Sequence, residues 1–257
     1  YLYYGNRLMQ LPFGVFGVAI ATVSFPYISS CVSNNDYEGL RLTIHNSLKQ
    51  AFFIVIPCSA GLIFLSGPIN AMLFYYGRFG LEDAMATANV SIIYCTAIFA
   101  FSAIKILTQV FYALNKARAA VKISLASVFI NIALSAILMK PLDYLGLAAA
   151  TAGAGIIQFV LLYVMVEKYA GNIRTRELVV YTMKILILSA LMGLIVMLMS
   201  GAMTGYFNPE MKRSVNALIV FACIATGTAF YFAAAVFMKI SEAKQMLGFI
   251  KQKLALK

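Results

Sequence analysis

Long apolar runs separated by short polar segments constrain this chain more than any other feature. A helix needs roughly 20 predominantly apolar residues to cross about 30 Å of hydrocarbon. No Asp or Glu falls deep within any run, as expected where an unpaired carboxylate would be costly. The pattern predicts an all-α fold, a polytopic transmembrane helical bundle with seven spans at about 5–28, 51–75, 89–113, 121–139, 145–166, 181–203 and 215–238.

The composition excludes an ordinary soluble domain. The chain is 62% hydrophobic and 11% charged, whereas a soluble domain is about a quarter charged. Its net charge of +11 would suit a nucleic-acid partner, but the long apolar runs argue against one. Basic residues gathered in loops on one face of a membrane, beside anionic lipid, explain this charge better. We therefore expect membrane lipids, and no nucleic acid, among the partners.

The basic residues are divided unequally between the two sides of the expected bundle. One side, formed by 29–50, 114–122, 167–184 and the tail after 238, carries Arg41, Lys49, Lys116, Arg118, Lys122, Lys168, Arg174, Arg176, Lys184, Lys239, Lys244, Lys251, Lys253 and Lys257. The other side carries Arg78, Lys140, Lys212 and Arg213. Because cytoplasmic loops are enriched in Lys and Arg, the first side is expected in the cytoplasm. This places the C-terminus inside and residue 1 outside.

Two polar segments have an apolar face at helical spacing. Leu40, Ile44 and Leu48 recur every four residues before the second run. In the tail a similar face is formed by Ile240, Ala243, Leu247, Ile250 and Leu254. Both segments are predicted to be helices along the cytoplasmic interface, with a solvated end as the alternative. The chain is thus divided into a transmembrane lobe, 1–238, and a cytoplasmic amphipathic tail, 239–257.

Two basic residues fall within the expected spans. Arg7 lies within about two turns of the start of the first run, and its guanidinium suits bidentate binding of a phosphate. It faces a water-filled cavity, pairs with another group, or extends to the membrane interface, and the residues alone do not decide. Lys105 is too deep in the third run to reach the interface, so we expect it to face the bundle interior. Gln109, one turn on, shares its face.

Other polar groups in the spans are explained most simply by helix packing. Asn131 and Ser135 lie one turn apart, and Thr151 and Gln158 share a face of the next span. Hydrogen bonds between helices are their expected role. Kinks or broken helix ends are expected at Pro12, Pro26, Pro57 and Pro68. The sequence has no intramembrane carboxylate pair, nucleophile elbow, P-loop or metalloprotease motif, which argues against an enzyme.

The opening of the chain matches a known family pattern. Residues 2–23, LYYGNRLMQLPFGVFGVAIATV, contain a tyrosine pair, then Asn6-Arg7-Leu8, Leu11-Pro12 and a Gly-rich helix. They resemble the MurJ/MviN family of lipid II flippases, members of the multidrug/oligosaccharidyl-lipid/polysaccharide (MOP) exporter superfamily. Weaker matches follow in the same order along essentially the whole chain, at Ser66-Gly67-Pro68-Ile69, Tyr76-Gly77-Arg78-Phe79, Lys105-Ile106-Leu107, Phe111-Tyr112-Ala113-Leu114 and Gly146-Leu147-Ala148.

The resemblance implies fourteen helices in two pseudo-symmetric lobes, of which this chain would supply helices eight to fourteen, one lobe of a MOP-type transporter. A start at Tyr1, without Met or a signal peptide, agrees with a C-terminal half. The implied protein is a multi-pass protein of the bacterial inner membrane. It moves lipid II, the undecaprenyl-pyrophosphate-linked peptidoglycan precursor, by alternating access. Its N-terminal lobe would be a partner, and residues 1–257 alone are expected to be inactive because one lobe cannot enclose the cavity.

Particular residues take roles from the resemblance. Arg7 would line a central cationic cavity and contact the pyrophosphate, and Asn6, Lys105 and Gln109 are the further candidate substrate contacts. The last two spans would form an apolar groove for the polyprenyl tail. No cofactor is expected beyond coupling to sodium or to the membrane potential, and the matching sodium positions are Asn131, Ser135, Leu147 and Thr151. Ser135 stands where the family has an Asp, which weakens this candidate site.

Two other interpretations stay open. A related exporter of the same superfamily would move another lipid-linked oligosaccharide, of the O-antigen type, or a drug. A drug antiporter should have an acidic cavity, whereas the spans here hold Arg7 and Lys105. A seven-helix receptor or scaffold is suggested only by the number of spans. Arginines in the first two helices of the N-terminal lobe would favour lipid II.

Overall fold

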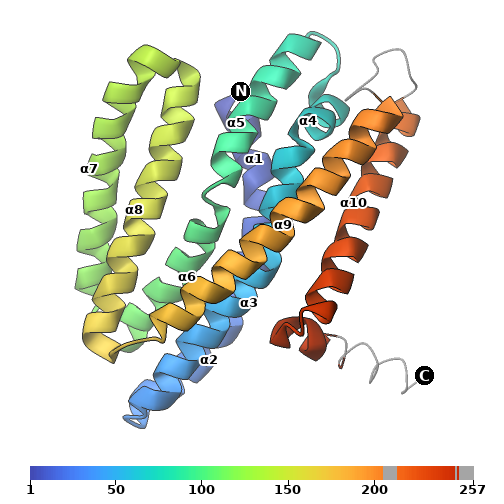
Figure 1. Cartoon of the computed structure of the whole chain (residues 1–257). Helices are drawn as coiled ribbons and strands as arrows, with labels where there is room; N and C mark the ends of the chain where they lie inside the picture. The colour runs from blue at the N-terminus through green and yellow to red at the C-terminus, as the bar shows by residue number, and fades with distance from the viewer. Residues whose placement is uncertain (205–212, 247, 249–257) are drawn as a thin grey trace.

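The computed structural model describes residues 1–204, 213–246 and 248, and this part of the chain is helical apart from short connections (Figure 1). Tyr76 and Phe79 form an isolated β-bridge. The elements are α1 (Leu2–Pro12), the π-helical segment η1 (Phe13–Val18), α2 (Ala19–Ser33), α3 (Tyr37–Phe64), α4 (Ser66–Phe74), α5 (Leu81–Cys95), α6 (Ile98–Ala113), α7 (Ala117–Leu142), α8 (Tyr144–Ala170), α9 (Thr175–Thr204) and α10 (Arg213–Phe237). The predicted all-α fold is confirmed.

The described helices provide six membrane crossings, or seven when the bent pair α5 and α6 is counted as one span. α1, η1 and α2 join into one helix, Leu2–Ser33, which is among 6 described helices long and apolar enough to cross a bilayer. α5 and α6 add the seventh crossing as a pair bent by 43°. Helices suit the hydrocarbon region because they satisfy their own backbone polar groups.

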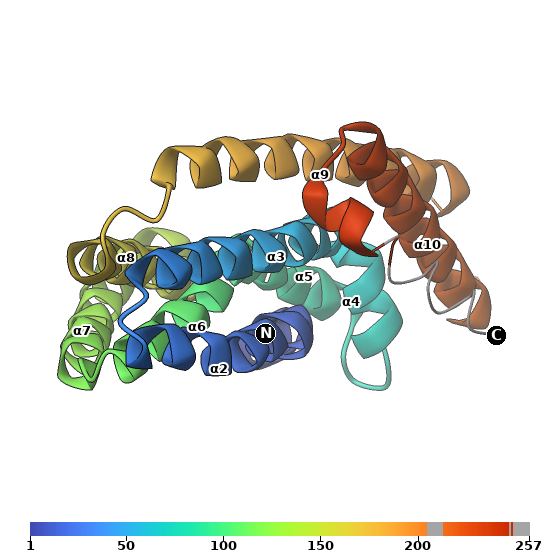
Figure 2. The ribbon, with the colours of Figure 1, turned by 90° about the horizontal axis from the view of Figure 1, so that it is seen from below.

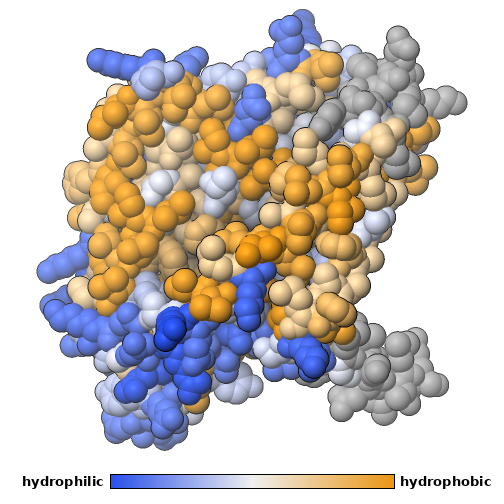
Figure 3. All heavy atoms as spheres, viewed as in Figure 1, coloured by the Kyte–Doolittle hydropathy of each residue, from blue (hydrophilic) through white to orange (hydrophobic). Residues whose placement is uncertain are grey.

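The chain runs up and down between two ends of the bundle (Figure 1). The connections after α2, α6, α8 and α10 lie at one end, which we call the basic end; its bases include Arg41, Lys116, Arg118, Lys168, Arg174, Arg176 and Lys239. Figure 3 shows hydrophilic side chains gathered there, beside a broad hydrophobic belt. Four more of the bases counted in the sequence, Lys212, Lys251, Lys253 and Lys257, lie outside the described residues.

The first helix and α9 cover opposite faces of the molecule. α7 and α8 form an antiparallel hairpin at one side, α9 crosses along α3, and α10 packs beside α9 (Figure 1). Seen from below, α9 forms one surface, while α1 and α2 form the other and pack against α3, α5 and α6 (Figure 2). The face of the first helix that points away from the bundle is therefore separate from the surface near α9.

The segment that precedes the second predicted span is not an interfacial helix. α3 runs without interruption from Tyr37 to Phe64. Leu40, Ile44 and Leu48 are each 0% exposed and belong to the main core cluster, together with residues of α2, α6, α8 and α9. A four-residue repeat marks an apolar face, but it does not distinguish a face covered by lipid from one covered by other helices. The tertiary packing decides here.

The start of the tail is packed against the bundle. Ile240 is 7% exposed and Ala243 is 0% exposed, and both join the main core cluster. The other predicted members of this apolar face, Leu247, Ile250 and Leu254, lie outside the described residues. The interfacial position of the tail stays a prediction.

An ion pair fastens this segment to α3. Lys49 Nζ lies 3.2 Å from Glu242 Oε1, and the two side chains are 19% and 10% exposed. Lys49 Nζ also lies 4.6 Å from the centre of the Tyr181 ring of α9. Burial alone would raise the pKa of Glu242, but hydrogen bonds from its backbone and Ser241, with the charge of Lys49, hold that pKa below its usual range. The pair ties three segments together at the basic end.

Two of the predicted spans are interrupted. The expected helix over 51–75 breaks at Leu65, and Pro68 lies in the first turn of α4, where its missing N–H costs nothing. The expected helix over 89–113 breaks between α5 and α6. In the first span the chain stays helical, but Pro12 is followed directly by the π-helical turns of η1. These interruptions position the side chains described next.

Candidate functional site

One face of the first helix carries the polar side chains that the sequence singled out. α1 packs against α5 through Gly5, where an added Cβ would come within 2.7 Å of Val90. The side of the helix that holds Gly5 is buried. The other side points away from the bundle because residues on it are offset by about half a turn. We call it the polar face; it consists of Tyr3, Asn6, Arg7 and Gln10.

Arg7 is exposed and held by a neighbouring tyrosine. Its Nη2 donates to Tyr3 Oη at 2.8 Å, and the guanidinium carbon lies 5.0 Å from the centre of the Tyr3 ring. Beside it Gln10 Nε2 donates to Asn6 Oδ1 at 3.1 Å. A guanidinium has five N–H donors, so the bond to Tyr3 leaves others available on the open side. Tyr3 thus orients a guanidinium that still has donors for a ligand.

No acid neutralises Arg7 in the part of the chain that the structure describes. The charged contacts found there are all at the basic end: Lys49 pairs with Glu242, Arg174 pairs with Glu177, and the His45 imidazole lies 3.9 Å from the Glu177 carboxylate. Arg7 lies near the opposite end of the first helix. A cation within a membrane span needs water, an anion or the interface, since bare hydrocarbon does not solvate it. The polar face is therefore suited to an anionic group.

Lys105 lies on the surface of the lobe and not in its interior, so that prediction was wrong. Its neighbours Ser102, Ala103 and Ile106 on α6 are each 0% exposed, whereas Lys105 is exposed. Among the described residues no ion pair or hydrogen bond holds it. Gln109, one turn on, is half-buried, and its Oε1 has no hydrogen-bond partner there. The sequence could not distinguish the interior of one lobe from a surface that this lobe leaves open.

The structure does not bring Arg7 and Lys105 together. η1 meets α6 where Gly17 lies against Ser102. Arg7 is ten residues before Gly17, or roughly 15 Å along the helix axis, and Lys105 lies about one turn beyond Ser102 toward the basic end. The two cations are therefore at different depths of the lobe and do not form one compact anion site.

The candidate sodium ligands include a hydrogen-bonded contact between α7 and α8. Asn131 Nδ2 donates to Thr151 Oγ1 at 3.3 Å, and Thr151 Oγ1 donates to Leu147 O at 3.0 Å. Tyr94 of α5 also contacts Thr151. Ser135 makes no hydrogen bond among the described residues. A hard cation prefers several oxygen ligands, charged ones above all. This set is neutral, and Asn131, Thr151 and Leu147 are linked by hydrogen bonds to one another, so it fits helix packing better.

The two helices expected to form a lipid-tail groove pack closely together. An added Cβ on Gly227 of α10 would come within 2.5 Å of Val196 of α9. Both helices expose large apolar side chains, among them Leu194, Leu198, Leu218 and Phe221. A groove between them that holds a polyprenyl tail stays a prediction.

Sequence reasoning missed the residues that orient the candidate contacts. Tyr3 holds Arg7, and Gln10 holds Asn6, although both pairs are four residues apart on one helix face and could have been paired from that spacing. No comparable spacing in the sequence predicted the π-helical segment η1. The expected hydrogen bonding of Gln158 is present, since its Nε2 donates to Ser124 Oγ of α7 at 3.0 Å.

Seven crossings, interrupted helices and an un-neutralised guanidinium on an open lobe face define the class: a polytopic helical membrane protein of the transporter type. The family model described as "Lipid II flippase MurJ" matches residues 1–216, so the chain belongs to this family. Transporters of this family are not enzymes, in agreement with the sequence analysis.

Relatives agree with this assignment, and a solved structure is similar in fold. A probable lipid II flippase MurJ of Helicobacter pylori strain J99 is 38% identical over 164 residues, covering 63% of this chain and 35% of the relative. That of Rickettsia prowazekii is 27% identical over 239 residues, covering 93% and 47%. A structure titled "Lipid II flippase MurJ, inward closed conformation" is similar in fold, with a TM-score of 0.69 and 24% identity over 92% of this chain and 47% of that one. The chain spans less than half the length of these proteins.

Proposed function

We propose that this chain is one lobe of a flippase that moves lipid II across the bacterial inner membrane by alternating access, with Arg7 as a contact for the pyrophosphate. The observation that carries the proposal is the state of Arg7, which is exposed on a membrane-spanning helix and bonded only to a neutral tyrosine. A planar, permanently charged guanidinium binds phosphate oxygens in pairs. Membership of the lipid II flippase family supports this substrate.

In this proposal the other polar groups have different tasks. Asn6 and Gln10 flank Arg7 and offer neutral hydrogen bonds to a headgroup. Lys105 and the unsatisfied Gln109 Oε1 lie further toward the basic end, where they would meet the headgroup at another stage of its passage. These are successive contacts along one route because the two cations are too far apart to grip one pyrophosphate.

The route needs a second lobe. In this chain the polar face is open, and a cavity that opens alternately to the two sides must be closed by another wall. That wall would come from an N-terminal lobe of the same protein, and residues 1–257 alone are inactive in transport. The basic end lies in the cytoplasm, which the enrichment of cytoplasmic loops in Lys and Arg supports.

Growth rescue tests the proposal. A bacterium depleted of its own lipid II flippase is supplied with the full-length protein, either wild type or Arg7→Ala, at equal membrane abundance. We expect the wild type to restore growth and Arg7→Ala to fail. Arg7→Lys should rescue growth partially, because an ammonium keeps the positive charge but lacks the paired N–H donors of a guanidinium. Lys140→Ala, at the exposed end of α7, is the matched control and should rescue fully.

Two outcomes would contradict it. Full rescue by Arg7→Ala removes Arg7 from the mechanism. Failure of the wild type, when it is present in the membrane, removes lipid II as the substrate and favours a related exporter of another lipid-linked oligosaccharide.

A further inference from the structure

A crevice separates α8 from α9 on the face opposite the polar face. α9 leaves α8 after the connection 171–174 and diverges from it along α3 (Figures 1 and 2). The space between the two helices holds a pocket of about 260 Å³. Val160 of α8 and Val179 and Met183 of α9 line its walls. The pocket opens on the outer surface of the lobe, where lipid would surround the helices.

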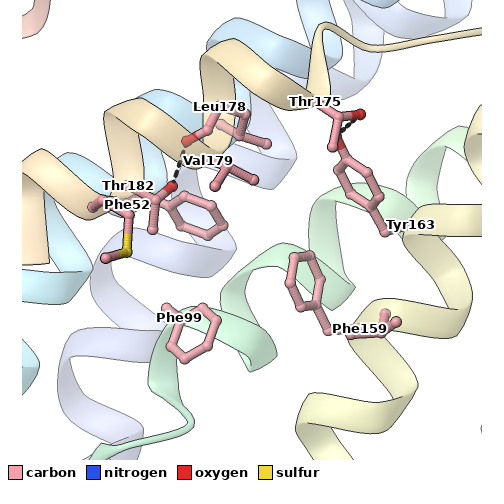
Figure 4. Close-up of a pocket in the computed structure, with 10 residues that line it drawn as sticks. Phe52, Phe99, Phe159, Tyr163, Thr175, Leu178, Val179 and Thr182 are labelled. Atoms are coloured by element: carbon pink, nitrogen blue, oxygen red, sulfur yellow. Dashed lines mark hydrogen bonds between the residues drawn. The ribbon is translucent and has the colours of Figure 1, made fainter.

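Three phenylalanines form the floor of this crevice. Phe52, Phe99 and Phe159 come from α3, α6 and α8, and their ring centres lie 6.0, 6.4 and 6.1 Å apart in edge-to-face arrangements (Figure 4). Such pairs fix the rings in place. The floor of the crevice is therefore aromatic and apolar.

The end of the crevice nearest the basic end is closed by a polar network. Tyr163 Oη and Thr175 Oγ1 lie 3.0 Å apart, as the dashed line in Figure 4 shows. The Thr175 hydroxyl also donates to the Glu167 carboxylate, which accepts a second bond from Ile173 N at 3.2 Å. The Glu167 carboxylate at this end is thus held by hydrogen bonds within the protein.

Two cations without a partner among the described residues lie at the basic end of the two helices that border the crevice. Lys168 follows Glu167 on α8, and Arg176 follows Thr175 on α9. Both are exposed, and no ion pair, hydrogen bond or ring contact holds either of them in this part of the chain. The nearby Arg174 is different, since it lies 3.8 Å from Glu177. With Glu167 and Glu177, this end of the two helices carries three bases and two acids, and the pocket beside it is apolar.

We propose that this crevice binds one acyl chain of an anionic phospholipid from the leaflet at the basic end, with the lipid phosphate at Lys168 and Arg176. The volume of about 260 Å³ is below the roughly 300–1,000 Å³ of ordinary small-molecule pockets, so a slender chain fits better than a sugar headgroup. An apolar gap facing hydrocarbon gains contacts when a chain fills it. Bases near the membrane surface select anionic headgroups.

Lipid binding to the purified full-length protein tests this site. Native mass spectrometry measures how many phosphatidylglycerol or phosphatidylcholine molecules stay bound, and with what affinity. We expect the wild type to hold one phosphatidylglycerol more tightly than phosphatidylcholine. Val179→Trp, which fills the crevice, should lose that molecule, whereas Leu198→Trp, at a 73% exposed position further along α9, should keep it. Arg176→Gln should weaken phosphatidylglycerol binding about fivefold and leave phosphatidylcholine unchanged.

Three results would overturn the proposal. One is phosphatidylglycerol binding by Val179→Trp equal to that of the wild type. Another is equal affinity of the wild type for the two phospholipids. The third is displacement of the bound phosphatidylglycerol by undecaprenyl phosphate at equal concentration, which would make the crevice an isoprenoid site. None of these measurements involves transport, so their outcome is independent of the flippase proposal.

Discussion

Gly17 of η1 lies so close to Ser102 of α6 that a Cβ at position 17 would come within 2.5 Å of Ser102 Oγ. Ser102 is 0% exposed, and its hydroxyl has no hydrogen-bond partner among the described residues. The contact joins the π-helical turns of the first span to the helix that carries Lys105. π-Helical turns are rare and occur frequently at functional sites. This contact sets how closely the first helix approaches α6.

Replacement of Gly17 by Ala should therefore destabilise the protein, although Ala normally favours a helix. Overpacking against Ser102 costs about 1–3 kcal/mol, which outweighs the helix-propensity gain of about 1 kcal/mol. Thermal unfolding of the purified full-length protein in detergent measures the effect. Gly14→Ala is the matched control in the same segment, because nothing lies within 4 Å of its added Cβ. Equal unfolding temperatures for the two variants would show that the close contact is not present.

The ion pair between Lys49 and Glu242 predicts a stability that falls in acid. The pKa of Glu242 is lowered in the folded protein, so the unfolded chain binds the proton more readily. The pair contributes fully above the ordinary glutamate pKa, and its contribution is lost as the pH falls through the lowered folded-state value. Glu242→Gln should cost about 1–3 kcal/mol at neutral pH and reduce the acid dependence of the unfolding temperature.

Unfolding of the wild type and of Glu242→Gln between pH 3 and pH 7 checks this. Glu38→Gln is the control, since Glu38 is exposed in the first turn of α3. Parallel pH profiles for the wild type and Glu242→Gln would contradict the assignment.

The sequence was sufficient to predict the membrane spans, whose length depends on the hydrocarbon thickness. It was insufficient to predict which helix faces are buried, because this depends on tertiary packing. Seven spans followed from run length, because a bilayer imposes that length on every crossing helix. The positions of Leu40 and Lys105 were predicted wrongly for a shared reason. The sequence identifies an apolar or charged helix face, but it does not show whether another helix, lipid or a second lobe covers that face. The crevice at Phe52 was invisible because it depends on the divergence of α9 from α8.

The contact between Asn131 and Thr151 predicts no specific effect of sodium. The two groups satisfy each other, and no carboxylate joins them among the described residues. Asn131→Ala should lower stability by about 0.6 kcal/mol, the usual size of such a bond between membrane helices. Unfolding temperatures in equal concentrations of sodium chloride and potassium chloride should agree. A rise specific to sodium that disappears in Asn131→Ala would restore the sodium site predicted from the family resemblance.

The charge distribution predicts the orientation in the membrane. A cysteine placed at Arg118, at the basic end, should be protected from a membrane-impermeant maleimide in intact cells with a permeable outer membrane. A cysteine at Lys140, in the last turn of α7, should be labelled. The native cysteines are replaced by Ala first. Labelling in the reverse pattern would place the basic end outside and contradict the positive-inside assignment.

The central claim is that Arg7 contacts the pyrophosphate of lipid II, and equilibrium binding of lipid II to the purified full-length protein tests it most directly. Hydrogen bonds to a charged group are worth about 1.5–3 kcal/mol, so Arg7→Ala should weaken binding by roughly 10-fold to 150-fold. The loss should shrink at high salt, and Lys140→Ala should bind as the wild type does. Wild-type affinity in Arg7→Ala would contradict the account.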